Sequence, residues 1–167
     1  IYNMNKIKRR LRYSYTAAFA GFIFGFDTIV ISGVDQKLQD LWHSTDLFHG
    51  LVVVGMALWG TVIGAIFGGL PTNYFGRKKT LLWIGFLYSV SAIGSSISTD
   101  PITFAFFRFI GGVGIGISTI AAPAYISEIS APNERGKLVG YYQLNIVVGI
   151  LFAFVSNFFL KEFGDSS

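Results

Sequence analysis

Five long apolar runs constrain the fold of this chain more than any other feature. They cover residues 15–33, 50–70, 80–98, 102–126 and 138–160. A helix needs roughly 20 mostly apolar residues to cross a bilayer core about 30 Å thick, and each run has about that length. Because backbone polar groups inside lipid must be paired, continuous runs of this kind span the membrane as helices. The sequence therefore predicts an all-α membrane protein with five transmembrane helices.

The composition agrees with a lipid bilayer as the solvent. Apolar residues make up 52% of the 167 and charged residues only 13%, too few for the polar surface of a soluble domain. There is no cysteine, which excludes disulfide, thiolate–metal and cysteine-nucleophile chemistry. Basic residues before the first run imitate a secretory signal, but the run is too long and contains an aspartate. The net charge of +4 forms no basic face, so we expect no nucleic-acid partner.

The charges between the runs predict which side of the membrane each loop faces. Lysine and arginine in short loops mark the cytoplasmic side. The N-terminal tail has five basic residues and no acid, and the loops after the second and fourth runs are also basic. The loops after the first and third runs are mainly acidic. We therefore expect a cytoplasmic basic tail at residues 1–14, a five-helix partial bundle at 15–160 and an extracytoplasmic tail at 161–167, in the cell's inner membrane.

Small residues and turn residues predict details of the bundle. Gly60, Gly64 and Gly68 repeat every fourth residue in the second run, and two further glycines, at 112 and 116, do so in the fourth. This spacing lets two helix backbones approach closely in a membrane. Before the fourth run, Asp100 is expected to cap the helix, with Pro101 at its first position. Further along, proline at position 123 predicts a kink.

Two charged residues lie inside the predicted spans. Asp27 is about six residues, or roughly 9 Å, before the outer end of the first span. Arg108 is at a similar distance after the outer start of the fourth. An intramembrane charge costs on the order of 3 kcal/mol and calls for a partner. Because both residues reach the same depth from helices that run in opposite directions, we predict a buried Asp27–Arg108 ion pair.

Two interpretations of this pair stay open. One is a static ion pair that only fixes helix packing, and the other is a proton-coupling site, which intramembrane charges favour. A neighbouring arginine favours an ionised carboxylate, whereas burial without it favours the protonated form. A conformational change that separates Asp27 from Arg108 would therefore let the carboxylate take up a proton. This needs no metal and no cofactor, and we predict neither.

Five motifs, in order along the chain, resemble those of the sugar porters of the major facilitator superfamily. They are Gly25-Phe26-Asp27 with Gly33, GLPTNYFGRK at 69–78, RFIGGVGIG at 108–116, PAYISEISAPNERGK at 123–137, and Gln143. Each motif alone is weak, whereas five in their expected places are a strong match over essentially the whole chain. The resemblance, especially to bacterial proton-coupled xylose and hexose transporters, implies a major-facilitator-type N-terminal bundle, of which the chain has the first five transmembrane helices.

The resemblance also implies a substrate site on the fifth span. Gln143 stands where the family carries a sugar-binding glutamine, and it lies roughly 12 Å into its helix, close to the midplane where transporter substrates bind. Its amide can both donate to and accept from sugar hydroxyls. Ile146 and Ile150 follow at helical spacing and are expected to line the same cavity. The alternative role for Gln143 is an interhelical hydrogen bond. Asn145 and Asn157 stay outside the predicted site.

A conformational latch on the inner face is a further implication of the resemblance. The residues expected to form it are Gly76, Arg77, Glu128 and Arg135. Such a latch favours the outward-open state and breaks as the two halves of a transporter rock. The chain departs from the family at Asn73 and Tyr74, where an acid and an arginine are usual, so the network is thinner. Solvated loop charges are the alternative interpretation.

The expected function is secondary transport of a monosaccharide, a pentose or hexose, with protons as the coupling ion and alternating access as the mechanism. Uncoupled facilitated transport and a non-transporting sugar sensor are the alternatives. The presence of Asp27 argues against the first, and the retention of both Asp27 and Arg108 argues against the second. No paired carboxylates, metal-ligand cluster or nucleophile–base motif indicates an enzyme. A transporter of this family needs both halves around its site, so we expect the C-terminal half of the same transporter as a partner.

The loop after the first span offers weaker signals. Trp42, His43 and His49 are expected near the outer interface of the membrane, where aromatic residues commonly anchor a protein. The two histidines are interpreted as loop residues without a special role.

Overall fold

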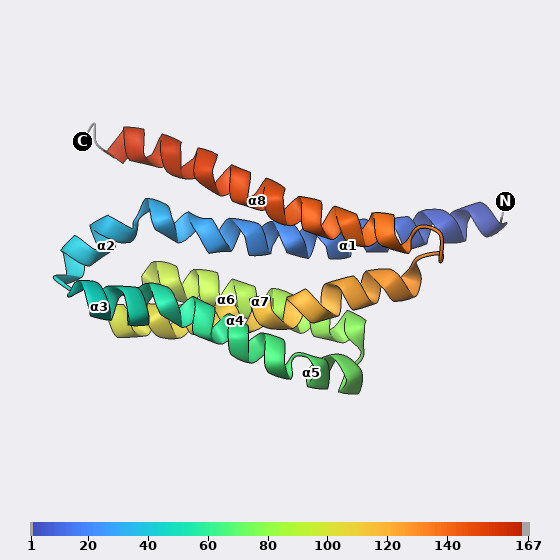
Figure 1. Ribbon diagram of the computed structural model, residues 1–167, viewed down its shortest axis with the longest axis horizontal. Helices are drawn as coiled ribbons and strands as arrows, with labels where there is room; N and C mark the ends of the chain where they lie inside the picture. The colour runs from blue at the N-terminus through green and yellow to red at the C-terminus, as the bar shows by residue number, and fades with distance from the viewer. Residues whose placement is uncertain (1, 165–167) are drawn as a thin grey trace. The chain divides into compact units, whose positions relative to one another are not determined.

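The computed structural model describes residues 2–164, which are helical apart from short turns (Figure 1). Within this part there is no β-strand. The segments long and apolar enough to cross a membrane are Tyr13–Gly33, Asp46–Phe67, Arg77–Ile97, Pro101–Ile129 and Arg135–Lys161. Each corresponds to one predicted run, with ends that differ by a few residues. The prediction of an all-α fold with five membrane spans is confirmed.

The helices of the described residues differ in length and kind. The first, α1 (Tyr2–Val30), ends in a 3-10 turn, Ile31–Gly33. The others are α2 (Asp35–Trp42), α3 (Asp46–Phe48), a π-helical segment (His49–Val54), α4 (Gly55–Phe67), α5 (Gly69–Tyr74), α6 (Arg77–Ile97), α7 (Pro101–Ile129) and α8 (Arg135–Gly164). Helix α1 thus includes most of the stretch predicted as a basic tail, and α7 continues through Pro123.

These elements form two compact units whose mutual placement is not determined. The middle unit contains residues 31–121, from the 3-10 turn through most of α7. The terminal unit contains α1, the end of α7 from Ala122 onward, and α8.

Backbone contacts between α4 and α7 hold the middle unit together. The contacting pairs are Gly60 with Phe109, Gly64 with Val113, Gly68 with Ile117, Gly112 with Ala57 and Gly116 with Thr61. In each pair, a Cβ atom added to the glycine would overlap a backbone atom of the other helix. The residue numbers rise together along both helices, so α4 and α7 run parallel. The predicted glycine faces are confirmed as the packing surface.

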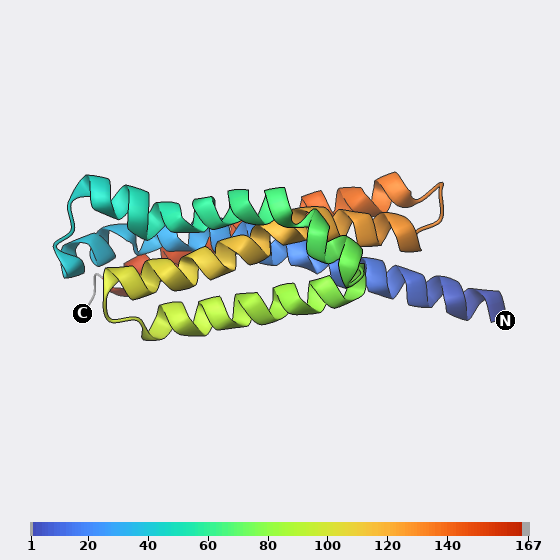
Figure 2. The same ribbon diagram turned by 90° about the horizontal axis from the view of Figure 1, so that it is seen from below.

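A short turn joins α6 to α7, and the two helices then pack side by side (Figure 2). Helix α7 begins at Pro101, and the Asp100 carboxylate caps it by accepting a hydrogen bond from the Thr103 N–H at 2.8 Å. This agrees with the cap predicted from the sequence. Further along, Gly94 of α6 is covered by the Phe107 ring of α7. Since contacts near the turn join late α6 to early α7, the two helices are antiparallel.

In the terminal unit, α1 and α8 run side by side in the same direction (Figure 1). Gly25 of α1 meets the backbone carbonyl of Ile146, and Gly149 of α8 meets that of Phe22. The lack of a side chain at both glycines lets the two backbones touch. Of the five spans, α8 is the least buried, since only 11% of its most apolar stretch is covered by other parts of the chain.

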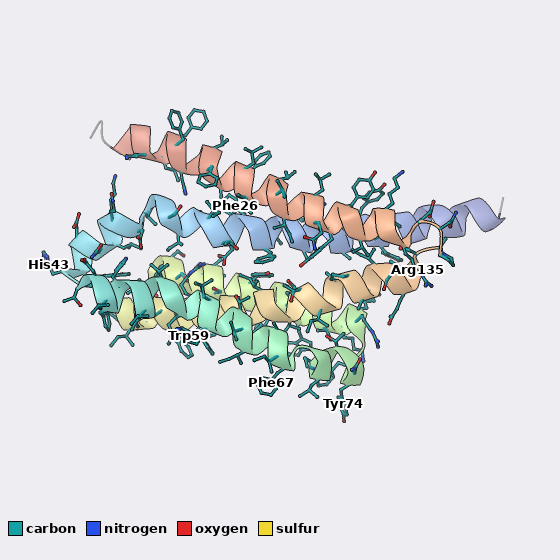
Figure 3. The ribbon with its side chains drawn as sticks, in the orientation of Figure 1. Phe26, His43, Trp59, Phe67, Tyr74 and Arg135 are labelled. Carbon is teal, nitrogen blue, oxygen red and sulfur yellow. The ribbon has the colours of Figure 1, made fainter. Side chains whose placement is uncertain are left out.

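The outer surface of the spans is apolar, as lipid contact requires. Trp59 and Phe67 project from α4 (Figure 3), and each is 57% exposed. Exposed phenylalanines continue along α8, for example Phe152 and Phe158. Contiguous apolar surface of this extent marks a membrane or protein contact. Together with span length, it makes the bilayer the environment of these helices.

Candidate proton-coupling and substrate site

Asp27 lies near the end of α1, the first membrane span. Its side chain is half-buried, and only Thr28, Ile29 and Val30 follow it in the helix. Two residues before Asp27, Gly25 packs directly on the backbone of Ile146. The part of α1 that carries the carboxylate is therefore held against α8.

Arg108 lies two turns into α7 and is buried, with 7% of its surface exposed. Its neighbour Phe107 covers Gly94 of α6, and Gly111 on the next turn contacts the Ser91 side chain. The part of α7 that carries Arg108 is therefore packed against α6. A buried arginine of this kind is costly in a membrane unless it serves an interaction.

The structure does not test the predicted pairing of these two residues. Asp27 belongs to the terminal unit and Arg108 to the middle unit. Each has an interaction partner within the described chain, so neither is an isolated charge. The Asp27–Arg108 ion pair stays a prediction.

The predicted substrate residues share helix α8. The Gln143 side chain is exposed, while Ile146 and Ile150 are half-buried. Ile146 also provides the backbone that contacts Gly25, two residues before Asp27. The structure thus brings together the two helices that carry the predicted coupling carboxylate and the predicted sugar-binding amide. Sequence reasoning placed these residues on separate spans and did not predict the contact.

The latch residues begin with a glycine in an unusual conformation. Gly76, between α5 and α6, has a φ of +83°, which only glycine adopts readily. The buried hydroxyl of Thr80 donates to the carbonyl oxygens of Pro71 and Gly76, both at 3.1 Å, and so ties the end of α5 to the start of α6. Arg77, the first residue of α6, is half-buried. Thr80 was not singled out from the sequence.

The other latch residues flank the turn between α7 and α8. Glu128 is the second-last residue of α7 and is exposed. Arg135 is the first residue of α8 and is also exposed (Figure 3). The Arg135 N–H donates to the carbonyl of Ala131 at 3.1 Å and closes the turn. Both lie in the terminal unit, whereas Arg77 lies in the middle unit. A network that joins all of them stays a prediction.

One polar cluster of the middle unit was missed by sequence reasoning. His49 is buried, with 3% of its surface exposed, and its Nε2 atom lies 2.8 Å from Oδ1 of Asp35. Its Nδ1 atom is 3.0 Å from the Ser44 hydroxyl. Trp42, on α2, donates to the Thr99 carbonyl at 3.2 Å. His49 is therefore a structural residue of the outer loop and not a simple loop histidine, whereas His43 is exposed as expected.

No local pattern could have revealed this cluster. Fourteen residues separate Asp35 from His49, and the pairing depends on how α2 folds back. Among the described residues there is no group of three or more His, Cys, Asp or Glu side chains that could hold a metal ion.

The chain is similar to known sugar transporters. Residues 13–167 match the family described as "Sugar (and other) transporter". The glucose transport protein of Synechocystis is 41% identical over 92% of the chain and 33% of its own length. The D-xylose-proton symporter of Escherichia coli is 34% identical over 90% of the chain and 36% of its own length.

Solved structures agree. One is a structure of the major facilitator superfamily proton:xylose symporter bound to 6-bromo-6-deoxy-D-glucose. It superimposes with a TM-score of 0.83 at 28% sequence identity, and the match covers 92% of the present chain and 38% of the symporter chain. An inward-open structure of the xylose transporter of E. coli superimposes with a TM-score of 0.79 at 30% sequence identity. This match covers 90% of the present chain and 40% of the transporter chain.

The helical fold and the membrane spans thus define a multi-pass membrane protein with the fold of the N-terminal half of a major facilitator superfamily protein. The chain belongs to the sugar transporter family, whose members are transporters and not enzymes. It spans about a third of the length of the curated relatives it matches.

Proposed function

We propose that the chain forms the first five spans of a transporter that moves a monosaccharide across the cell membrane together with a proton. One observation carries this proposal: α1, with Asp27, packs backbone to backbone on α8, with Gln143, and one of these contacts is at Gly25, two residues before Asp27. A change at the proton site is then transmitted directly to the helix that binds sugar. The relatives named as arabinose-proton and D-xylose-proton symporters support the same coupling.

The proposed cycle uses the chain's own charges. Asp27 carries the proton, and Arg108 is its charge partner in the state without a bound proton. Sugar hydroxyls bind the Gln143 amide, and Ile146 and Ile150 supply the apolar wall of the cavity. Alternating access then exposes the site first to one side and then to the other, with Gly76, Arg77, Glu128 and Arg135 as the inner latch. The C-terminal half of the transporter completes the site.

The test is uptake by the complete transporter in proteoliposomes, with radiolabelled D-glucose, D-xylose and L-arabinose as probes. An inward proton gradient should drive accumulation of at least one sugar above equilibrium, and sugar addition should make the outside medium more alkaline. Gradient-independent uptake without alkalinisation would instead establish facilitated transport. Sugar binding without uptake would establish a sensor.

The variant Asp27→Asn should lose at least 90% of uphill accumulation, because an amide cannot carry the proton. Exchange of labelled for unlabelled sugar should continue in this variant, since exchange needs no net proton movement. Asp40→Asn, at an exposed acid of α2, is the matched control and should behave as the wild type. Uphill accumulation that survives Asp27→Asn would refute the proposed coupling site.

A further inference from the structure

A side-chain hydrogen bond joins the outer ends of α1 and α8. The Asn157 amide donates from Nδ2 to the backbone carbonyl of Ile29 at 3.2 Å. Asn157 is half-buried and lies on α8, and Ile29 is the second-last residue of α1. The two helices separate toward this end (Figure 1), so a side chain is needed to bridge them. The amide therefore replaces the direct backbone contacts made nearer the middle.

The acceptor is a backbone carbonyl at the very end of a helix. Helix α1 changes to a 3-10 turn directly after Val30, one residue beyond Ile29. The Asn157 amide, which comes from a different helix, therefore contacts α1 at the point where its α-helical part ends.

This bond confines the segment that carries Asp27. Asp27 lies between Gly25, which packs on the backbone of Ile146, and Ile29, which accepts from Asn157. Both anchors belong to α8. Asp27 thus lies on a short stretch of α1 that contacts α8 both before and after it in the sequence.

Asn145 provides an internal comparison on the same helix. Its amide donates to the Tyr141 carbonyl at 2.8 Å, one turn earlier in α8 itself. The two asparagines have the same chemistry, but only the bond of Asn157 reaches another helix. The sequence alone gives no reason to distinguish them, and both lie outside the predicted substrate site.

The part of α8 that follows Tyr142 is almost free of titratable groups. Between Tyr142 and Lys161, α8 has no titratable side chain. Within the terminal unit, the end of α7 contributes Tyr125 and Glu128, and Arg135 and Lys137 begin α8. Lys161 is one turn beyond Asn157 and is exposed. The group of α8 that bonds the outer end of α1 is thus a neutral amide and not a charge.

We propose that Asn157 is a positioning residue for proton coupling: by holding the outer end of α1 on α8, it keeps the Asp27 carboxylate where coupling requires it. The proposal rests on the proposed coupling role of Asp27. Asn157 itself touches neither proton nor sugar. Its loss lets the end of α1 shift, which changes the proton dependence of transport more than the affinity for sugar.

The experiment compares Asn157→Leu, which removes the amide at similar size, with Asn157→Gln, which retains a donor, and with the control Asn145→Leu. Uptake of the labelled sugar that the wild type accumulates is measured in proteoliposomes over a range of outside pH, together with exchange and the apparent KM. A membrane hydrogen bond of average strength corresponds to a shift of about half a pH unit. We expect that shift for Asn157→Leu, with KM within about twofold of wild type.

Exchange by Asn157→Leu should be retained, Asn157→Gln should restore the pH profile, and Asn145→Leu should leave it unchanged. Lys161→Gln should also leave it unchanged, which separates the amide from the nearby charge. Should Asn157→Leu fail to fold, Asn157→Ser, which shortens the side chain out of reach, takes its place. A wild-type pH profile in these variants overturns the proposal, as does an equal loss of exchange and uphill uptake.

Asp27→Asn in the same series separates the two proposals. If Asp27→Asn abolishes uphill uptake and Asn157→Leu has a wild-type profile, only the positioning role is wrong. If Asp27→Asn transports uphill, the coupling site is wrong and the positioning role falls with it.

Discussion

Glycines of similar sequence context have different roles in this chain. On α8, Gly149 faces the backbone of Phe22, whereas Gly140 has no atom of another helix within 4 Å of where its Cβ would lie. Both residues lie in the same apolar span, so hydropathy does not distinguish them. Only the register of α8 on α1 decides which glycine is required.

The pair yields a direct comparison. Gly149→Ala should lower the thermal stability of the transporter in detergent, because overpacking costs roughly 1–3 kcal/mol. Gly140→Ala, the matched control, should leave stability equal or raise it, since alanine is the better helix former by about 1 kcal/mol. Melting followed by size-exclusion chromatography measures both variants. Equal melting temperatures would show that α1 and α8 do not touch at this glycine.

Gly76 is required by its backbone conformation and not by close packing. Its φ of +83° is strained for any other residue, and no atom lies within 4 Å of the position of an added Cβ. Gly76→Ala should therefore destabilise the α5–α6 turn by about 1–3 kcal/mol. Gly69→Ala, in the same loop motif and equally open, should be neutral. Melting temperature and uptake are the readouts, and a stable Gly76→Ala protein would argue against the strained turn.

Single residues could be predicted where one residue alone determines the property. Asp27 and Arg108 stood out because a charge in an apolar run is visible without a fold. Asn157 and His49 did not, because their roles come from partners far along the chain. The sequence shows which side chains are charged, whereas the partner of each side chain depends on how the helices pack.

At the scale of elements, the start of α7 depends on one carboxylate. The Thr103 N–H donates to Asp100, and this hydrogen bond holds the pKa of the Asp100 carboxyl below its usual value. A carboxyl whose pKa is lower in the folded state stabilises the protein above its unfolded pKa, near about 4. That stabilisation disappears as the pH falls through the lower, folded value.

Asp100→Ala should therefore lower the melting temperature at neutral pH, with a difference that shrinks below about pH 4. Asp100→Asn retains an acceptor oxygen and should melt between the two, without the acid dependence. Melting in detergent from pH 3 to pH 7 distinguishes these outcomes. A difference independent of pH would mean that the charge does not contribute to the cap.

Elements of the loops were less predictable than the spans. The long runs set the five spans to within a few residues, because hydropathy and length decide membrane insertion. Helix α2 and the π-helical start of the second span were not predicted, since their stability comes from contacts such as Trp42 on Thr99 and His49 on Asp35. Such contacts have no periodic signal in the sequence.

At the scale of the whole molecule, the distribution of charge predicts one orientation. In the middle unit, basic residues begin α6, while acids occur in α2, in α3 and before α7. The positive-inside rule then places the α5–α6 turn in the cytoplasm and α2 outside.

The absence of cysteine from these 167 residues makes this orientation testable by labelling. Leu41→Cys on α2 and Tyr74→Cys on α5 introduce thiols at positions that are 70% and 86% exposed. In intact cells, a membrane-impermeant maleimide should label the first at least tenfold more than the second. Permeabilisation should make labelling equal. Stronger labelling of Tyr74→Cys than of Leu41→Cys would mean that the chain has the opposite orientation in the membrane.

The predicted site is less complete than the predicted fold. The contact between α1 and α8 places Asp27 and Gln143 on adjoining helices, which neither residue's depth alone could show. The predicted Asp27–Arg108 pair and the predicted latch each involve residues of different units. The pair is supported by the depth of the two residues in the sequence, and the latch by the family resemblance. The fold follows from each span's own composition, whereas the site depends on how the spans meet.

The pairing of α1 with α8 also has a consequence in time. Ile29 and Asn157 are 128 residues apart, and a ribosome adds about 5–20 residues per second. Helix α1 therefore waits in the membrane for roughly 6–26 seconds before its partner is synthesised. Throughout that interval it must remain inserted on its own apolar residues, with Asp27 counting against it. Of these five spans, the one that is made first is thus paired with the one that is made last. Its sequence must therefore be stable in the bilayer before its partner is present, in addition to carrying Asp27.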